Sequence, residues 1–355
     1  MEDRVERIVR AHLAKLPLAS LPAGLDGAAG AALLASALGD RERARVYLDR
    51  AIAGAEELDA GLHSGVLGIC WAAEHIDPER VAPNALPLLD ELVDVPVWNS
   101  YYDLVYGLVG FGVYALGRLA DPGAEGCVEH IVRHLEASAV AAGSGCAWHT
   151  DGRLVLPALK AADGGFDLGL AHGIPGVIAF LAACVRKNVA AKAARALLEP
   201  AVSWLLEQRL PQGTFPAFVA RGATAPPGPT RTAWCYGDPG VAVALRAAGR
   251  ALNRPAWEGE AIARMRAIAA RPLECTGVED AGICHGAAGL ALMFEAFGES
   301  SAAHAWRERA VEWLETSIPD LGFLSGMAGV GLALLPSMAT SLPFRELLLL
   351  EAHGP

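Results

Sequence analysis

The sequence has few aromatic residues, no strip of basic residues and no long uncharged apolar run, and each shortage excludes a class of protein. Aromatic residues make up 6% of the chain and β-branched runs are few, so the 53% hydrophobic content favours helices over sheets. The 29 Lys and Arg are outnumbered by 40 Asp and Glu, so nucleic acid is not an expected partner. No uncharged apolar run reaches the roughly 18 residues of a membrane span, so we expect no transmembrane segment.

The N-terminus lacks the marks of a secretion signal. Residues 1–16 alternate charged and apolar side chains, with no apolar stretch followed by a small-residue cleavage site. The seven cysteines are an odd number and form no Cys-x-x-Cys pair. We therefore expect reduced thiols in a cytoplasmic protein, most of them packed as small apolar side chains.

A phrase of the form Gly-x-x-Gly, followed by an apolar stretch, occurs seven times in the chain. Most neighbouring copies are about 40 residues apart, which suits a repeat of two helices and two turns. Two intervals are longer and contain the Gly-, Pro- and Thr-rich segments 141–167 and 212–232, for which we predict long loops. The leading glycines of the seven phrases are Gly27, Gly65, Gly107, Gly173, Gly237, Gly286 and Gly326.

The repeat predicts an all-α fold. Each phrase is followed by a helix that is apolar nearly all round, and amphipathic stretches such as 41–58 and 256–273 lie between the phrases. Seven such hairpins could stack as an open solenoid or close into a ring. The inner helices carry no polar face, and the terminal repeats are no more polar than the others. We therefore predict an α/α toroid (a double α-barrel) of seven helical hairpins, with seven inner and seven outer helices.

The residue before each leading glycine is polar or has a polar tip. Asp and Ser are good helix N-caps, and we expect that role for Asp26, Ser64 and Ser325. Histidine and tyrosine are poor caps. In a ring the equivalent positions converge at one end, so Tyr106, His172, Tyr236 and His285 predict a polar ring at the mouth of the toroid.

At the position two residues before the leading glycine, cysteine occurs in only two repeats, and these two repeats are consecutive. Cys235 and Cys284 are therefore expected to face each other, with His285 beside them. Two thiolates and an imidazole suit Zn²⁺, and three protein ligands leave a fourth position open, as in catalytic zinc sites. The alternative of two packed thiols and a core histidine remains. We interpret Cys70, Cys127, Cys146, Cys184 and Cys275, which lie outside this pattern, as core residues.

The same logic places three further residues near the expected metal. His172 lies one repeat before Cys235, Asp103 precedes the third phrase, and Arg231 lies four residues before Cys235. Each also has a structural alternative, as a packed ring, a helix cap and a solvated loop charge, respectively.

Three of the phrases together resemble the lanthipeptide cyclases, also called the lanthionine synthetase C-like family. The family carries Trp-Cys-Tyr-Gly-x-Pro-Gly, Cys-His-Gly and Ala-His-Gly-x-x-Gly. The sequence has these three motifs at 234–240, 284–286 and 171–176, respectively. Their order along the chain is the order expected for the family. The Tyr-Tyr-Asp-Leu stretch at 101–104 is similar to the family's acidic position. The resemblance spans residues from about 24 to 335.

The resemblance implies a single toroid domain over residues 1–355, with N- and C-terminal helical extensions, in a stand-alone cyclase. It implies one zinc per chain on Cys235, Cys284 and His285. It maps the acid/base residue to His172, the aspartate to Asp103, and supporting roles to Arg231 and Tyr236. The implied reaction is a Michael-type addition of peptide cysteine thiols to dehydroalanine or dehydrobutyrine, which closes thioether rings.

The resemblance also implies partners. The substrate is a dehydrated precursor peptide made by a separate dehydratase, and a transporter and a peripheral association with the membrane through these partners are compatible with it. Two alternatives stay open, namely addition of glutathione to dehydrated residues, and a non-catalytic peptide-binding toroid with structural zinc. A toroid glycosidase ranks last, because it needs paired carboxylates and the polar positions offer only Asp26 and Asp103.

Overall fold

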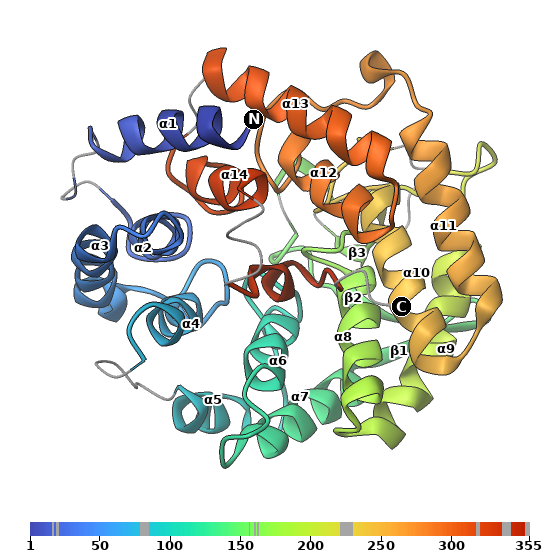
Figure 1. The fold of residues 1–355 in the computed structure, drawn as a ribbon. Helices are drawn as coiled ribbons and strands as arrows, with labels where there is room; N and C mark the ends of the chain where they lie inside the picture. The colour runs from blue at the N-terminus through green and yellow to red at the C-terminus, as the bar shows by residue number, and fades with distance from the viewer. Residues whose placement is uncertain are drawn as a thin grey trace. The chain divides into compact units, whose positions relative to one another are not determined.

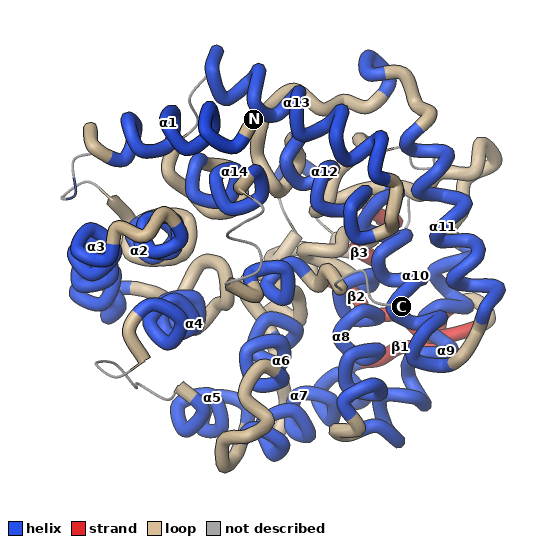
Figure 2. The backbone as a smooth tube through the Cα atoms, in the orientation of Figure 1, coloured by secondary structure: helices blue, strands red, loops and turns tan. Residues whose placement is uncertain are grey.

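The computed structural model describes residues 1–15, 18, 21–78, 85–155, 157–159, 161, 163–220, 230–316, 320–335 and 342–351. These residues form fourteen α-helices and four short β-strands (Figures 1 and 2). The chain divides into two compact units, one of residues 1–85 and 278–355 and the other of residues 86–277. In the described residues, no helix combines the length and the hydrophobicity that crossing a bilayer requires. The expectation of a single domain over 1–355 stays a prediction.

The first unit contains four buried helices and three helices that cover them. Helix α2 packs against α4 and α14, and α12 packs against α14. The covering helices pack on this group, α1 on α14, α3 on α2 and α13 on α12. The bounds are α1 (Glu2–Leu13), α2 (Ala28–Ala37), α3 (Arg41–Ala53), α4 (Val66–Ile76), α12 (Ala287–Ala296), α13 (Ser300–Thr316) and α14 (Met327–Leu334).

The second unit repeats this plan. Helix α8 packs against both α6 and α10, and these three buried helices are covered by α7, α9 and α11. Helix α5 packs on α7. The bounds are α5 (Leu86–Val93), α6 (Leu108–Leu116), α7 (Ala124–Ser138), α8 (Ile174–Lys187), α9 (Ala191–Glu207), α10 (Asp238–Leu252) and α11 (Pro255–Ala269).

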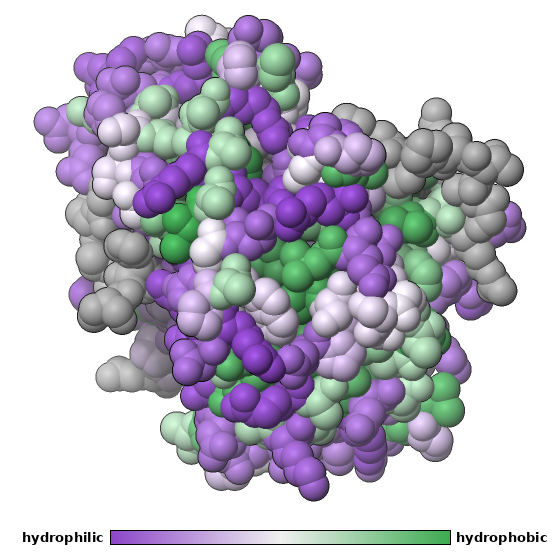
Figure 3. Space-filling model, turned by 90° about the vertical axis from the view of Figure 1, so that its right-hand side faces the viewer, coloured by the Kyte–Doolittle hydropathy of each residue, from purple (hydrophilic) through white to green (hydrophobic). Residues whose placement is uncertain are grey.

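The division into inner and outer helices predicted from the sequence is confirmed by burial. Nine of the ten residues of α12 are buried, whereas α13 buries four of its 17 residues. The outer helices turn their charged side chains to solvent, and the molecular face in Figure 3 is mostly hydrophilic with smaller hydrophobic areas between. Inner helices are therefore stabilised by apolar burial on every side, and outer helices by one face only.

The two long inserts are not simple loops, and that prediction was wrong in part. They contribute to an antiparallel sheet with the strand order β1-β2-β3-β4. Gly145 starts β2, and a Cβ there would lie 1.9 Å from the Pro200 carbonyl oxygen of α9, so glycine lets the strand lie close to the helix. Residues 221–229 of the second insert lie outside the described residues. The bounds are β1 (Ala139–Ala142), β2 (Gly145–Thr150), β3 (Gly165–Asp167) and β4 (Phe218–Ala220).

Each Gly-x-x-Gly phrase begins an inner helix, and the leading glycine is the N-cap residue in all seven. The predicted capping roles of Asp26, Ser64 and Ser325 are therefore wrong. The Asp26 carboxylate instead accepts from the Leu324 N–H at 2.9 Å, and the Ser64 hydroxyl donates to Asp59 at 3.0 Å.

Backbone carbonyls take over the capping role. The chain turns back before each inner helix, so that the N–H of Leu108 bonds the carbonyl of Tyr101 and the N–H of Ala287 bonds that of Asp280. The glycines make room for this turn. A Cβ on Gly107 would lie 2.0 Å from the Tyr101 oxygen, and a Cβ on Gly289 would lie 1.8 Å from the Ile283 oxygen. The glycines of the Gly-x-x-Gly phrase are thus needed for the conformation of the turn. The atoms that a Cβ would meet belong mostly to the same turn rather than to a neighbouring helix.

Candidate active site

His172 and Asp103 form a direct pair in the second unit. His172 lies on the turn before α8, and its Nδ1 is 2.8 Å from Asp103 Oδ2. Asp103 lies on the turn before α6, where its Oδ1 accepts from the Tyr106 N–H at 2.7 Å. The side chains of Asp103 and His172 are 5% and 15% exposed, so the pair is largely shielded from water. The structure therefore brings together the predicted acid/base residue and the predicted aspartate.

Two tyrosines from neighbouring repeats lie close to the His172 ring. The centroid of Tyr106 is 5.8 Å away and that of Tyr236 is 5.9 Å away, and both rings are nearly parallel to the imidazole, at 27° and 23°. These are the residues before the leading glycines of repeats three, four and five. The predicted convergence of these positions is therefore observed within this unit.

Asp167 completes this group and was not predicted from the sequence. The Tyr236 hydroxyl donates to Asp167 Oδ2 at 2.8 Å, and the Gly169 N–H donates to Oδ1 at 2.8 Å. A sequence signal was present, because Asp-x-Gly begins six residues before the leading glycine in four repeats, at Asp59, Asp167, Asp280 and Asp320.

Burial and charge shift the acid–base properties of these groups. Burial raises the pKa of Asp167 to about 6, against the lowering effects of the Gly169 N–H, the His172 charge and the Tyr236 hydroxyl. Burial opposes protonation of His172, but the hydrogen bond to Asp103 and the negative charges around the ring outweigh it and raise the pKa of His172. Burial and the Asp167 charge raise the pKa of Tyr236, so its hydroxyl stays protonated. His172 is thus suited to donate a proton near neutral pH.

A pocket of about 250 Å³ opens onto this group. His172, Asp103 and Asp167 line it, together with the segment 98–102 before α6. Side chains from β2 and the residues after it, His149, Asp151 and Arg153 among them, also contribute to the wall. The insert that was predicted to be a long loop thus provides part of the pocket.

Arg231 lies elsewhere. It is exposed, and it is not among the residues that line the pocket in the described part of the chain. Its carbonyl oxygen lies 2.2 Å from where a Cβ on Gly237 would be, so its backbone forms the turn before α10. Arg231 occupies the position six residues before the leading glycine, where four other repeats have aspartate.

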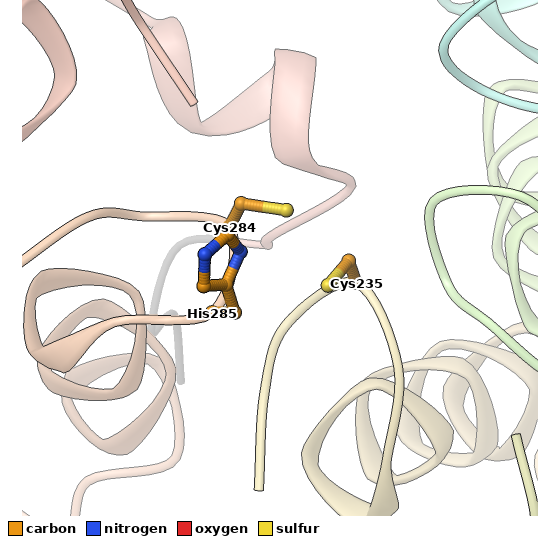
Figure 4. Close-up of side chains that lie close together, drawn as sticks. All are labelled: Cys235, Cys284 and His285. Atoms are coloured by element: carbon orange, nitrogen blue, oxygen red, sulfur yellow. The ribbon is translucent and has the colours of Figure 1, made fainter. Parts of the chain in front are cut away.

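The first unit contributes Cys284 and His285, on the turn before α12 (Figure 4). Both residues are half-buried, and the Cys284 Sγ lies within 4.8 Å of a ring nitrogen of His285. The His285 Nε2 lies 3.2 Å from Asp280 Oδ2. The N–H groups of Ile283 and Cys284 both bond the Leu324 carbonyl at 2.8 Å, which ties this turn to the next repeat. Thiol and imidazole are therefore held together on a fixed turn.

The second unit contributes Cys235, on the turn before α10 (Figure 4). The residue is 3% exposed, and its carbonyl accepts from the Ala171 N–H at 3.4 Å, next to His172. Its place two residues before the leading glycine is the same as that of Cys284. Two thiols and one imidazole make a donor set that suits zinc.

The other cysteines follow the predicted packing role with one exception. Cys70, Cys127 and Cys184 are buried and Cys146 is half-buried, whereas Cys275 is exposed. The interpretation of Cys275 as a core residue is therefore wrong. It lies at the end of a 3-10 turn, Leu273–Cys275, that follows the outer helix α11.

The sequence matches known proteins along most of its length. The family model of "Lanthionine synthetase C-like protein" matches residues 22–349. Among solved structures, the chain is similar to "Nisin cyclase", with a TM-score of 0.79 and 21% identity, over 98% of this chain and 96% of that chain. This likeness shows the fold and confirms the predicted class of helical toroid. No curated protein matches the sequence. Because the family model covers most of its residues, the chain belongs to the lanthionine synthetase C-like family.

Proposed function

We propose that the protein is a zinc-dependent lanthipeptide cyclase. It adds cysteine thiols of a dehydrated precursor peptide to dehydroalanine or dehydrobutyrine and so forms lanthionine and methyllanthionine rings. The observation that carries the proposal is the shielded His172–Asp103 pair at the pocket, in a chain of the lanthionine synthetase C-like family. The likeness to a protein named as a cyclase supports the reaction class.

We assign one zinc ion per chain to Cys235, Cys284 and His285. The donor chemistry supports this, as does the placement of both cysteines two residues before a leading glycine in consecutive repeats. Three protein ligands leave room for a thiol from the substrate. When bound, zinc supplies a positive charge that lowers the pKa of a coordinated thiol and so makes it a thiolate at neutral pH.

His172 delivers the proton that completes the addition. The peptide sulfur forms a bond to the β-carbon, and the electron pair of the double bond moves to an enolate. That enolate takes a proton from His172 at the α-carbon, and the proton released by the thiol restores the imidazolium. Asp103 occupies Nδ1, so proton donation falls to Nε2. Asp103 also raises the pKa of His172, which increases the charged fraction of the donor.

Tyr236 positions the imidazole rather than donating to substrate. Its hydroxyl proton is committed to Asp167, and its ring lies nearly parallel to that of His172. The role of Arg231 in stabilising the enolate charge stays a prediction, and its exposed side chain must turn into the pocket for that. Asp167 adds a second carboxylate to the pocket, but Asp103 is bonded to His172 and Asp167 to Tyr236, which argues against a glycosidase.

The proposed setting follows from the reaction. The substrate must arrive with dehydrated serines and threonines, so a separate dehydratase acts first, and we place both enzymes in the cytoplasm. A transporter and a peripheral association with the membrane through these partners fit the same proposal.

The test is an assay for free thiols. Each ring consumes one thiol without a change in mass, so a thiol-alkylating reagent adds fewer labels to a cyclised peptide. A purified dehydrated peptide should lose labelling with the wild-type protein, and His172→Asn should slow the loss by roughly 10²–10⁴-fold while zinc stays bound. Full activity of His172→Asn would remove it as the acid.

A parallel arm separates the alternatives. A dehydrated peptide without cysteine is offered together with glutathione, and a mass increase would identify a glutathione-adding enzyme. Zinc-loaded protein that binds the cysteine-containing peptide but leaves its thiols free would indicate a non-catalytic binding toroid.

A further inference from the structure

A carboxylate accompanies the proposed zinc-binding histidine in the first unit. Asp280 Oδ2 lies 3.2 Å from His285 Nε2, at the distance of an ion pair. The other oxygen of the same carboxylate, Oδ1, accepts from the Gly282 N–H at 2.7 Å. The two oxygens thus have separate partners, one on the backbone of the turn and one on the imidazole.

In two other repeats the Asp-x-Gly turn has no histidine contact among the described residues. In the next repeat, Asp320 Oδ1 accepts from the Gly322 N–H at 3.2 Å, and the residue before the leading glycine is Ser325. In the second repeat, Asp59 Oδ1 accepts from the Gly61 N–H at 2.8 Å and from the Ser64 hydroxyl at 3.0 Å. The hydrogen bond from the glycine N–H to the aspartate is therefore shared by these turns. The contact with a histidine is an extra feature of the Asp280 turn.

A carboxylate next to the His285 ring affects which of its two nitrogens can bind a metal. A neutral imidazole carries its proton on one nitrogen and offers the other as a ligand. A carboxylate accepts and cannot donate, so the Asp280 oxygen favours the tautomer with the proton on Nε2. That leaves the lone pair on Nδ1. Carboxylates that hold a ligating histidine in this way typically improve metal affinity by about 10- to 100-fold.

We propose that Asp280 is a positioning residue of the zinc site, which selects the tautomer of His285 that binds through Nδ1. The inference rests on the proposed zinc site. The Asp280 side chain is 42% exposed and that of His285 is 32% exposed, so water weakens the contact. We therefore expect an effect at the lower end of that range, about tenfold in zinc affinity.

The informative variant is Asp280→Asn. Asparagine keeps the size of the side chain, and its carbonyl oxygen can still accept from the Gly282 N–H. Its amide group then faces His285 Nε2 as a donor, which favours the opposite tautomer. Asp280→Ser is the second variant, because the short hydroxyl can serve the turn but cannot reach the ring. Asp320→Asn is the matched control, since it makes the same change in an equivalent turn that contacts no histidine within the described part of the chain.

The quantity to measure is the zinc dissociation constant of the intact protein. It is obtained by competition with a chromophoric chelator, and thermal unfolding checks that each variant is folded. We expect about tenfold weaker binding for Asp280→Asn and Asp280→Ser, and unchanged binding for Asp320→Asn. The nitrogen chemical shifts of a ¹⁵N-labelled His285 ring in zinc-loaded wild type should show a protonated Nε2 and a metal-bound Nδ1.

Three results would overturn the inference and leave the zinc site intact. The first is equal affinity in wild type and both Asp280 variants, and the second is an equal loss in Asp320→Asn. Zinc bound through Nε2 in the labelled protein would likewise contradict it. Wild-type protein that binds no zinc would overturn the proposed metal site itself, and the role of Asp280 with it.

Discussion

Asp103 Oδ2 lies 2.8 Å from His172 Nδ1, although 69 positions separate the two residues in the chain. Each residue belongs to the turn that leads into an inner helix, Asp103 before α6 and His172 before α8. A hydrogen bond from the Leu104 N–H to the Ala171 carbonyl, 3.0 Å long, joins the two turns directly beside the pair. The backbone of two repeats thus fixes the orientation of the imidazole, and several measurable consequences depend on that.

Asp103→Asn should shift the pH dependence of cyclisation. The Asp103 carboxylate raises the pKa of His172, so its loss should lower that pKa and reduce the fraction of imidazolium at neutral and basic pH. In a plot of kcat/KM against pH, we expect the basic limb to move to lower pH. A reduced rate with an unmoved basic limb would contradict His172 as the titrating donor. Unchanged zinc content in the variant is the control.

The same pair should contribute to stability in a defined pH window. The pKa of His172 is raised in the folded protein, so its contribution is fully present below the pKa of an unfolded histidine, about 6.5, and is lost as the pH rises through the folded value. Wild type should therefore exceed Asp103→Asn in unfolding free energy by more at about pH 6 than at about pH 9. Urea denaturation at the two pH values measures the difference, and a larger gap at the higher pH would contradict the assignment.

Asp167→Asn should show a dependence on pH of the same direction, in a lower pH window. Burial raises the pKa of Asp167 to about 6, so the folded protein binds this proton more tightly than the unfolded chain does. Wild type therefore loses stability as the pH rises from the unfolded pKa, about 3.9, through the folded value. The asparagine variant does not titrate, and relative to wild type it should gain on the order of 2 kcal/mol between about pH 4 and pH 8. Parallel stability curves in urea would show that Asp167 is not a buried, titrating carboxyl.

Removal of either proposed zinc thiolate should remove the metal. We expect about one zinc per wild-type chain, and little or none in Cys235→Ala and Cys284→Ala, because two remaining ligands bind zinc far more weakly than three. Cys275→Ala is the control, since Cys275 is exposed and outside the repeat position of the other two. Elemental analysis of freshly purified protein decides this. Zinc retained in both single variants would mean that the two cysteines are packing residues.

Glycine-to-alanine substitutions should separate the two kinds of glycine in the helices. A Cβ on Gly289 would lie 1.8 Å from the Ile283 carbonyl oxygen, so Gly289→Ala must displace the turn before α12, and we expect a loss of more than about 2 kcal/mol. A Cβ on Gly126 in α7 or on Gly259 in α11 meets nothing within 4 Å. These two substitutions should stabilise the protein by about 0.4–1 kcal/mol. Thermal unfolding compares the three, and a neutral Gly289→Ala would contradict the steric account of the phrase.

Local sequence alone led to several features of this protein. The seven glycine phrases predicted where inner helices begin, and each helix does begin directly after its leading glycine, as with Gly173 and Ile174. Helix onset is a short-range event that depends on residues within one turn, so a repeated phrase is sufficient to predict it. The capping roles of Asp26 and Ser64 were predicted wrongly, because backbone carbonyls of the preceding turn meet the free N–H groups of the helices.

Other features depended on contacts between repeats. The antiparallel sheet pairs β3 with β4 across more than one helix, and strands of three residues are too short to show an alternating pattern. Asp167 was missed because its role requires Tyr236, which is 69 positions away and on another repeat.

The sequence by itself determined the repeat, the chemical identity of the proposed ligands and acid, and hence the family, because these depend on residue type and spacing. Tertiary structure decided which groups pair, as Asp103 with His172 and Tyr236 with Asp167. It also decided the direction of their pKa shifts, since burial and the distances between charges exist only once the turns of different repeats meet.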